Sequence, residues 1–204
     1  MNIPTPEVLQ ALLGKAEPAT ALPDDLMHAA VLLPLFERDG GYHVVLTRRS
    51  RNIPDAGVIC FPGGGFESSD PDLTSTALRE AHEEIGVAPE DVRVLGAIEP
   101  YFTRYGFAIH PVVGLIPADY PYTLSEYEVD EIIEPPLGAL YDPANLRHES
   151  LLRPEGLVKR FTYVYEGRII FGVTAQMLSR MLELIAEGME KEVPWQSRTP
   201  AWRA

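Results

Sequence analysis

Three glutamates stand close together in one predicted helix of this 204-residue chain. Glu80, Glu83 and Glu84 are spaced i, i+3 and i+4, so an α-helix places their carboxylates on one face. Neighbouring anions repel each other, and the helix dipole disfavours them near a C-terminus. A sequence that accepts both penalties is typical of a cation site, and oxygen ligands favour Mg²⁺ or Mn²⁺ over zinc. The same spacing is also common on solvated acidic surfaces, so the flanking residues must decide.

The flanking residues favour the cation site. The run Gly63-Gly64-Gly65 predicts a loop in which the backbone can approach a ligand or metal closely. Arg79 directly precedes the acids and can orient them or pair with Asp70. A helix is predicted from Asp70, which caps its first turn, through Pro71 at the first helical position to Gly86 just beyond its C-terminus. The glycine loop therefore leads directly into the acidic helix.

The stretch GGGFESSDPDLTSTALREAHEEIGV resembles the Nudix box, whose pattern is G-x5-E-x7-R-E-U-x-E-E-x-G-U with U a large aliphatic residue. Residues 79–87 match every fixed position except that Ala81 is small for U. Five residues separate Gly64 from Asp70, which replaces a glutamate, and eight residues then lead to Arg79. The aspartate and the one-residue extension are features of one Nudix subgroup.

The resemblance implies an enzyme that hydrolyses a diphosphate linked to another moiety, using water and a divalent metal, Mg²⁺ or Mn²⁺. It also implies that Arg79 pairs with Asp70. The implied catalytic residues of the box are Glu80, Glu83 and Arg79. The implied metal ligands are Glu80, Glu83, Glu84 and the Gly64 carbonyl.

The general base is either a box glutamate or an acid from a later segment. Residues 127–133, YEVDEII, supply Glu128, Asp130 and Glu131, and this region often approaches the site in relatives. For any one of these acids, an exposed strand edge is the alternative interpretation. We take Glu131 as the catalytic candidate among them.

Segments outside the box resemble coenzyme A pyrophosphatases, which cut coenzyme A or its derivatives into phosphopantetheine and adenosine 3′,5′-bisphosphate. The resemblance implies a Nudix-type α/β/α sandwich with a mixed sheet, of class α/β (α+β), over residues 28–188. A helix and arm at 1–27 precede this domain, and a tail at 189–204 follows it. The resembling segments are LTRRS (46–50), GVICFPGG (57–64), TRYGFAIHPVVG (103–114) and IIFGVTAQML (169–178).

Two positions depart from the subgroup pattern. Asp55 stands where its members usually carry histidine, and Val58 stands where they carry glutamine. The departures keep open another substrate, such as ADP-ribose, another nucleoside diphosphate derivative or a dinucleoside polyphosphate. A third hypothesis is a non-catalytic nucleotide-binding module, but such proteins typically lose box acids, which this chain retains.

An arginine cluster in this acidic chain predicts phosphate binding, because the guanidinium fork binds phosphate oxygens in pairs. Pairing with the acidic surface is the alternative interpretation. The predicted substrate-binding residues are Arg48, Arg49, Arg51, Gly63 and Gly64.

The composition limits the partners. With 17 Lys and Arg against 30 Asp and Glu, the formal net charge is −13, which argues against binding to DNA or to acidic membranes. A small nucleotide-diphosphate substrate remains compatible, because a bound metal reverses the local field. No signal segment or membrane span is recognised, so a cytoplasmic protein is expected, as a monomer or homodimer. The single cysteine, Cys60, is expected to be a buried apolar residue.

The remaining pattern predicts strands and helices that intermix, with tight hairpins that exclude a purely parallel sheet. Ala77, Ala81 and Ile85 form an apolar stripe that directs the box helix toward a core. The other predicted helices cover 6–13 and 174–188. The predicted strands cover 28–36, 42–47, 58–61, 91–101, 108–117 and 127–133, with a hairpin over 160–172 that turns at Glu166-Gly167.

Overall fold

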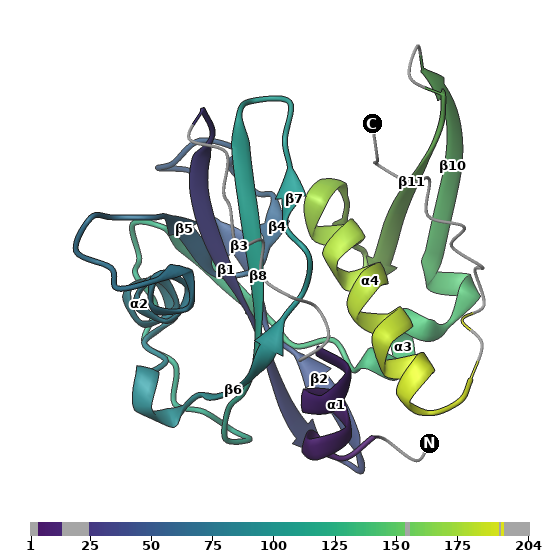
Figure 1. Ribbon diagram of the computed structural model, residues 1–204, viewed down its shortest axis with the longest axis horizontal. Coiled ribbons are helices and arrows are strands. Elements are labelled where there is room, and N and C mark those ends of the chain that lie inside the picture. Colours follow the sequence, from purple (N-terminus) through teal and green to yellow (C-terminus); the bar gives the residue numbers. More distant parts are fainter. Residues whose placement is uncertain (1–3, 14–24, 154–155, 192, 194–204) are drawn as a thin grey trace.

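The computed structural model describes residues 4–13, 25–153, 156–191 and 193 (Figure 1). Its elements, in chain order, are α1 (Pro6–Leu13), β1 (Met27–Arg38), β2 (Gly41–Val44), β3 (Leu46–Arg49), β4 (Ile59–Cys60), β5 (Gly63–Gly65), α2 (Leu73–Ile85), η1 (Pro89–Asp91), β6 (Arg93–Ala97), β7 (Tyr101–Phe102), β8 (Phe107–Leu115), β9 (Val129–Ile133), α3 (Leu137–Tyr141), η2 (Pro143–Asn145), β10 (Leu146–Arg153), β11 (Gly156–Tyr165), β12 (Arg168–Ile170) and α4 (Gly172–Gly188).

The central six-stranded sheet is mixed, as the sequence predicts. Strand β1 runs parallel to β8 but antiparallel to β2 and β5. The continuous path is β2–β1–β8–β6, while β5 pairs with β1 and β7 pairs with β8. Two three-stranded sheets, β4–β3–β9 and β10–β11–β12, complete the fold. Helix α2 covers one face of the central sheet, and α4 lies on the other side (Figure 1). The predicted α/β sandwich is confirmed.

Alternate residues of β1 serve two separate cores, because successive side chains of a strand point to opposite faces. Leu33 and Leu35 belong to the large cluster that includes α1 and α4. Ala30 and Leu32 pack on the other face, against α2. The small residues Ala77 and Ala81, both fully buried, let the helix lie close to the sheet. The apolar stripe predicted for the box helix is thereby confirmed.

Three strand predictions need correction. The single strand predicted over 91–101 is two short strands, β6 and β7, which both pair with β8. The strand predicted over 42–47 is two strands, β2 and β3, which belong to different sheets. The Gly63–Gly65 run, predicted as a loop, is strand β5 on the edge of β1. A Cβ on Gly63 would lie 2.4 Å from the Ala30 carbonyl oxygen, so only glycine permits this close pairing. Strand β10 and helix α3 were not predicted.

The start of the box helix also needs correction. Helix α2 begins at Leu73, and its N-cap is Asp72, whose carboxylate accepts a hydrogen bond from the Ser75 amide at 2.7 Å. Asp70 therefore does not cap the helix, which frees its carboxylate for Arg79. The predicted end is confirmed, since Gly86 adopts a left-handed conformation with φ of 73°.

The terminal elements follow their predictions where the structure describes them. Helix α1 has the predicted bounds, and α4 begins two residues earlier than predicted. The β11–β12 hairpin turns at Glu166 and Gly167, both at positive φ. Residues 14–24 of the predicted arm and 194–204 of the predicted tail lie outside the described residues, and the domain boundaries stay a prediction. Within the described residues, every helix is too short or too polar to cross a membrane.

Candidate active site

The three box glutamates differ sharply in exposure although they share one helix. The Glu83 side chain is 54% exposed and the Glu80 side chain 17%. Glu84 is buried, at 7%. Along the helix face, Glu83 is thus exposed, Glu80 is largely buried and Glu84 is buried.

Each of the two inner glutamates faces a glycine of β5. The carboxyl carbon and both oxygens of Glu80 lie 2.6 Å from the point where a Cβ on Gly64 would stand. The carboxylate of Glu84 accepts a hydrogen bond from the Gly63 amide. Because any side chain at residue 64 would displace Glu80, the glycines define the space in which the acids converge.

Arg79 joins the glycine strand to the acids. Its guanidinium forms a two-pronged pair with Asp70, at 2.9 and 3.1 Å, and donates to the Gly65 carbonyl at 2.9 Å. The remaining nitrogen contacts Glu80 at 2.9 Å and Glu83 at 3.1 Å. Pairing with Arg79 holds the pKa of Asp70 well below its usual range. The implied Arg79–Asp70 pair is therefore present in the structure.

The buried Glu84 has an incomplete set of partners. Burial raises the pKa of its carboxyl to about 8, and the nearby charges of Glu80 and Glu128 add to this, while the Gly63 amide and Arg49 oppose it. Its Oε2 atom is buried and has no hydrogen-bond partner among the described residues. A buried carboxylate oxygen without a partner is costly unless a cation or a proton satisfies it.

The acids fit a hard divalent cation but do not form a finished metal site. Among the described residues, no three His, Cys, Asp or Glu side chains are gathered tightly enough to hold a metal ion. Arg79 explains this, since it draws Glu80 and Glu83 toward its own guanidinium. The donors are all oxygens, one of them buried and unpartnered, which suits Mg²⁺ or Mn²⁺.

The stability of the metal-free protein should fall as the pH rises from about 4.5 to about 8. The folded-state pKa of Glu84 lies near 8 against an ordinary 4.5, so in this window the folded protein binds more protons than the unfolded chain. Melting temperatures across this range, with EDTA present, measure the effect. Glu84→Gln should flatten the profile, and an unchanged slope in that variant would refute the assignment.

A segment after β8 brings a fourth acid to the box. The Thr123 amide donates to the Ile85 carbonyl at 3.1 Å, and the Ser125 amide donates to the Glu84 carbonyl at 2.9 Å. A Cβ on Gly86 would meet Thr123 at 2.9 Å, so the glycine also makes room for this segment. Glu128 follows, and its charge raises the pKa of both Glu80 and Glu84. The turn that carries Glu128 is therefore hydrogen-bonded to the C-terminal end of the box helix.

Glu131, the catalytic candidate from the sequence, takes part in a different set of contacts. It accepts from the Arg48 Nε at 2.8 Å and also pairs with Arg168 of β12. By strand alternation, it shares a face with Ile133, which packs in the large core cluster. The structure thus does not bring Glu131 to the box acids, and its catalytic role stays a prediction that the geometry does not favour.

The three predicted substrate arginines, Arg48, Arg49 and Arg51, differ in their contacts. Arg48 pairs with Glu131, and both side chains are about a third exposed, at 34% and 32%. Arg49 lies near the box, since its charge lowers the pKa of Glu84, and its Nε donates to the Pro54 carbonyl at 2.9 Å. Arg51 is exposed in the turn after β3. Of the three arginines, Arg49 is therefore the best placed for substrate.

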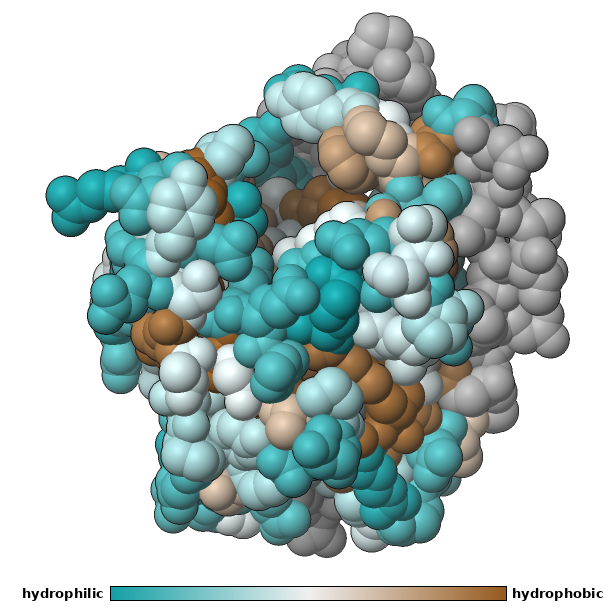
Figure 2. Space-filling view, turned by 90° about the vertical axis from the view of Figure 1, so that its left-hand side faces the viewer, coloured by the Kyte–Doolittle hydropathy of each residue, from teal (hydrophilic) through white to brown (hydrophobic). Residues whose placement is uncertain are grey.

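Two features complete the surroundings of the box. Cys60, predicted to be buried, is partly buried, and its Sγ lies 3.5 Å from the Thr47 hydroxyl, while desolvation raises the pKa of its thiol. Seen from the α2 side, the surface is hydrophilic around a hollow whose floor is apolar (Figure 2).

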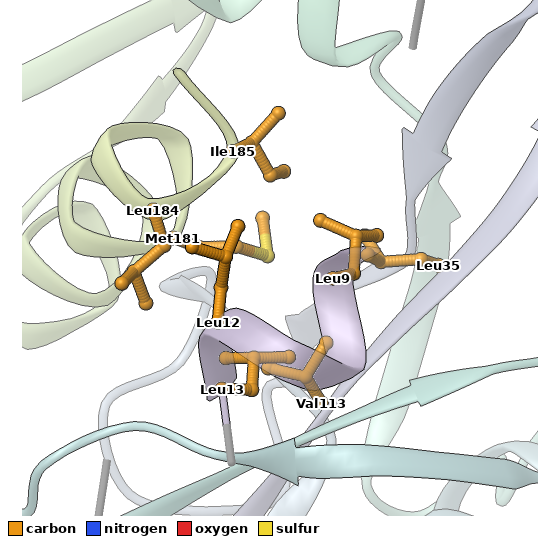
Figure 3. A pocket seen from close by; sticks show the side chains of 8 residues that line it. All are labelled: Leu9, Leu12, Leu13, Leu35, Val113, Met181, Leu184 and Ile185. Atoms are coloured by element: carbon orange, nitrogen blue, oxygen red, sulfur yellow. The ribbon is translucent and has the colours of Figure 1, made fainter. Parts of the chain in front are cut away.

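A second cavity has no functional character. It measures about 10 Å³ and lies between α1, α4 and the sheet (Figure 3). Only apolar side chains line it, so a water molecule there would find no polar partner. The lining residues are Leu9, Leu12, Leu13, Leu35, Val113, Met181, Leu184 and Ile185.

Comparison with known proteins agrees with this geometry. The family model described as the NUDIX domain matches residues 26–153, which include every box residue. The chain belongs to the Nudix family. It is therefore a Nudix hydrolase, of a family that acts on pyrophosphate bonds of nucleoside diphosphate derivatives and generally requires divalent metal ions.

Individual relatives of this Nudix hydrolase support the family assignment. The uncharacterized Nudix hydrolase NudL of Enterobacter sp. (strain 638) is 43% identical over 153 residues, which cover 75% of this chain and 80% of that protein. NudL of Citrobacter koseri is 35% identical with the same coverage. Among solved structures, the Nudix hydrolase RenU of M. smegmatis matches with a TM-score of 0.55 and 19% identity, covering 78% of this chain and 86% of that one. DR0079 of Deinococcus radiodurans matches with a TM-score of 0.52 and 16% identity, covering 79% and 86%. These two likenesses show the fold.

Proposed function

We propose that this Nudix hydrolase cleaves the diphosphate of coenzyme A or a derivative, giving phosphopantetheine and adenosine 3′,5′-bisphosphate. The observation that carries the pyrophosphatase assignment is the convergence of Glu80 and Glu84 on Gly64 and Gly63, beside the bidentate Arg79–Asp70 pair. The resemblance of the flanking segments to coenzyme A pyrophosphatases supports the choice of substrate. A cytoplasmic location and a monomer or homodimer remain predictions.

Glu80, Glu83, Glu84 and the Gly64 carbonyl are the residues that would hold Mg²⁺ or Mn²⁺. Once bound, such an ion would neutralise charge on the diphosphate oxygens and lower the pKa of water. Glu84 supplies a ligand oxygen that has no competing partner among the described residues. Asp70 and the Gly65 carbonyl anchor Arg79, which contacts Glu80 and Glu83, so these two acids would have to turn from Arg79 toward the ion.

Glu128 is our candidate for the general base. In the reaction, a water oxygen forms a bond to phosphorus, the bridging P–O bond breaks, and Glu128 takes the proton of the water. Its place in the fold supports this role, because its amide donates to the Ser125 carbonyl and the Ser125 amide donates to the Glu84 carbonyl. Arg49 is placed to contact a phosphate group, because it is the predicted arginine whose charge reaches Glu84.

The test is product analysis by mass spectrometry with purified protein and Mg²⁺ or Mn²⁺. The substrates are coenzyme A, acetyl-coenzyme A, ADP-ribose and a dinucleoside tetraphosphate. We expect phosphopantetheine, or its acetylated form, and adenosine 3′,5′-bisphosphate as the dominant products. If ADP-ribose or the dinucleoside tetraphosphate is hydrolysed while coenzyme A stays intact, the proposed substrate is wrong but the proposed reaction class stands.

Asp55 supports that second substrate class. It is exposed, adopts a left-handed conformation with φ of 59°, and lies in the turn whose Pro54 carbonyl binds Arg49. An anion near Arg49 would repel the additional 3′-phosphate of coenzyme A.

Replacing this anion should improve the use of coenzyme A. We expect Asp55→Asn, which tolerates the same backbone conformation, to lower KM for coenzyme A about threefold, since roughly half a kcal/mol is typical of an exposed charge pair. The matched control is KM for ADP-ribose, which lacks the 3′-phosphate and should change less. Equal changes for both substrates would show that Asp55 does not discriminate between them.

A further inference from the structure

Ser50 is a fully buried polar residue at the end of β3, outside the box. Its amide donates to the Glu128 carbonyl at 2.9 Å, and its hydroxyl donates to the Tyr127 carbonyl. The same hydroxyl oxygen accepts from the Asn52 amide at 3.1 Å. One serine therefore connects β3, the turn that follows it and the segment that carries Glu128.

The other end of that segment is fixed to the box helix. The Ser125 amide donates to the Glu84 carbonyl at 2.9 Å, and the amides of Glu128 and Val129 both donate to the Ser125 carbonyl at 2.9 Å. Glu128 thus stands between an anchor on α2 and an anchor on β3. The two anchors fix the backbone from which the Glu128 side chain extends.

We propose that Ser50 is a positioning residue that holds Glu128 at the metal–diphosphate site. The inference rests on the proposed role of Glu128 as general base. The Ser50 hydroxyl fixes the Tyr127 peptide, which immediately precedes Glu128, and so sets the direction of the carboxylate. Without the hydroxyl, the Asn52 backbone amide would lose that acceptor, and the Tyr127 carbonyl would keep only the longer contact from the Asn52 side-chain amide at 3.3 Å. A base displaced by about 1 Å can cost up to a hundredfold in rate.

A double-mutant cycle tests the coupling. Ser50→Ala should lower kcat about tenfold on whichever diphosphate substrate the enzyme cuts, with KM little changed. In a Glu128→Gln background, the same substitution should lower kcat less than twofold, because the group that Ser50 positions is already disabled. Independent, multiplying effects of the two substitutions would overturn the proposal.

Ser179 provides the matched control. It is also a buried serine, whose hydroxyl contacts the Tyr163 hydroxyl at 2.8 Å and the Ala175 carbonyl at 2.8 Å, but it lies on α4. Ser179→Ala should lower the melting temperature and leave kcat within twofold of the wild-type value. A tenfold loss of kcat in this variant would show that any buried serine acts through general stability, and would overturn the proposal.

Hydrogen exchange tests the anchor without any activity. In Ser50→Ala, the amides of residues 125–129 should exchange at least tenfold faster, while Ser179→Ala leaves them unchanged. Unchanged exchange in Ser50→Ala overturns the proposal even if no substrate is found. If exchange rises but Glu128→Gln keeps full kcat, the anchor exists and the assignment of Glu128 as base has failed.

Discussion

Replacing Glu84 with glutamine should lower kcat about a thousandfold, which corresponds to about 4 kcal/mol of transition-state stabilisation. Glu84 offers the proposed metal a buried oxygen that has no other partner among the described residues, and an amide cannot supply that charge. The measurement is steady-state hydrolysis with saturating Mg²⁺, together with metal affinity by calorimetry. Wild-type turnover in this variant would contradict the proposed ligand set.

The stability of the same variant excludes unfolding as the cause. Glutamine conserves the shape of the side chain and removes a carboxyl whose burial raises its pKa to about 8. At pH 9 the metal-free variant should therefore be at least as stable as the metal-free wild-type protein. A large loss of melting temperature at that pH would mean that Glu84 has a structural role instead.

Replacing Gly64 with alanine should lower kcat about a hundredfold while the fold remains intact. The added Cβ would meet the Glu80 carboxylate at 2.6 Å. Because that carboxylate is the far end of a flexible side chain, Glu80 can turn away and the backbone need not move. The proposed site then loses the position of one ligand, and misplacement of about 1 Å is enough for such a loss. Steady-state kinetics of the purified variant measure the loss of kcat, and its melting temperature shows whether the fold is intact.

Gly65→Ala is the matched control for this substitution. It adds the same methyl group one residue later in β5, where nothing lies within 4 Å of the new atom. We expect kcat within threefold of the wild-type value and a similar melting temperature. Equal losses in both variants would mean that the glycine strand tolerates no side chain, and the specific contact between Gly64 and Glu80 would not be the reason.

Much of the fold could be predicted because the sequence patterns are local. The apolar stripe through Ala77, Ala81 and Ile85 and the glycine at 86 fixed the box helix to within a few residues of its observed span. The start was misplaced because two aspartates, Asp70 and Asp72, can both cap a helix. Only the pairing of Asp70 with Arg79 in the structure shows that Asp70 is not the cap.

The glycine strand was less accessible to sequence reasoning. Three consecutive glycines are typical of a loop, and their strand conformation depends on β1. The requirement for glycine at 63 and 64 comes from the Ala30 carbonyl and the Glu80 carboxylate, which are distant in sequence. Tertiary contacts of this kind leave no local pattern.

The choice of Glu131 among the later acids stays a prediction, and the sequence alone could not decide it. Glu128, Asp130 and Glu131 are equivalent in sequence, and alternation along β9 separates the last two but does not identify the face of the box. The β-bulge between Arg48 and Arg49 changes the register with β9 at this point. Arg168, which pairs with Glu131, gave no sequence signal, because its partner lies 37 residues earlier.

The most direct test of the central claim is the position of bound Mn²⁺ in crystals, located by anomalous diffraction. We expect an ion in direct contact with carboxylate oxygens of Glu83 and Glu84, with Glu80 and the Gly64 carbonyl completing its ligands. Glu128 should then lie within reach of a water on that ion. Manganese bound elsewhere, with Glu84 still unligated, would contradict the proposed site.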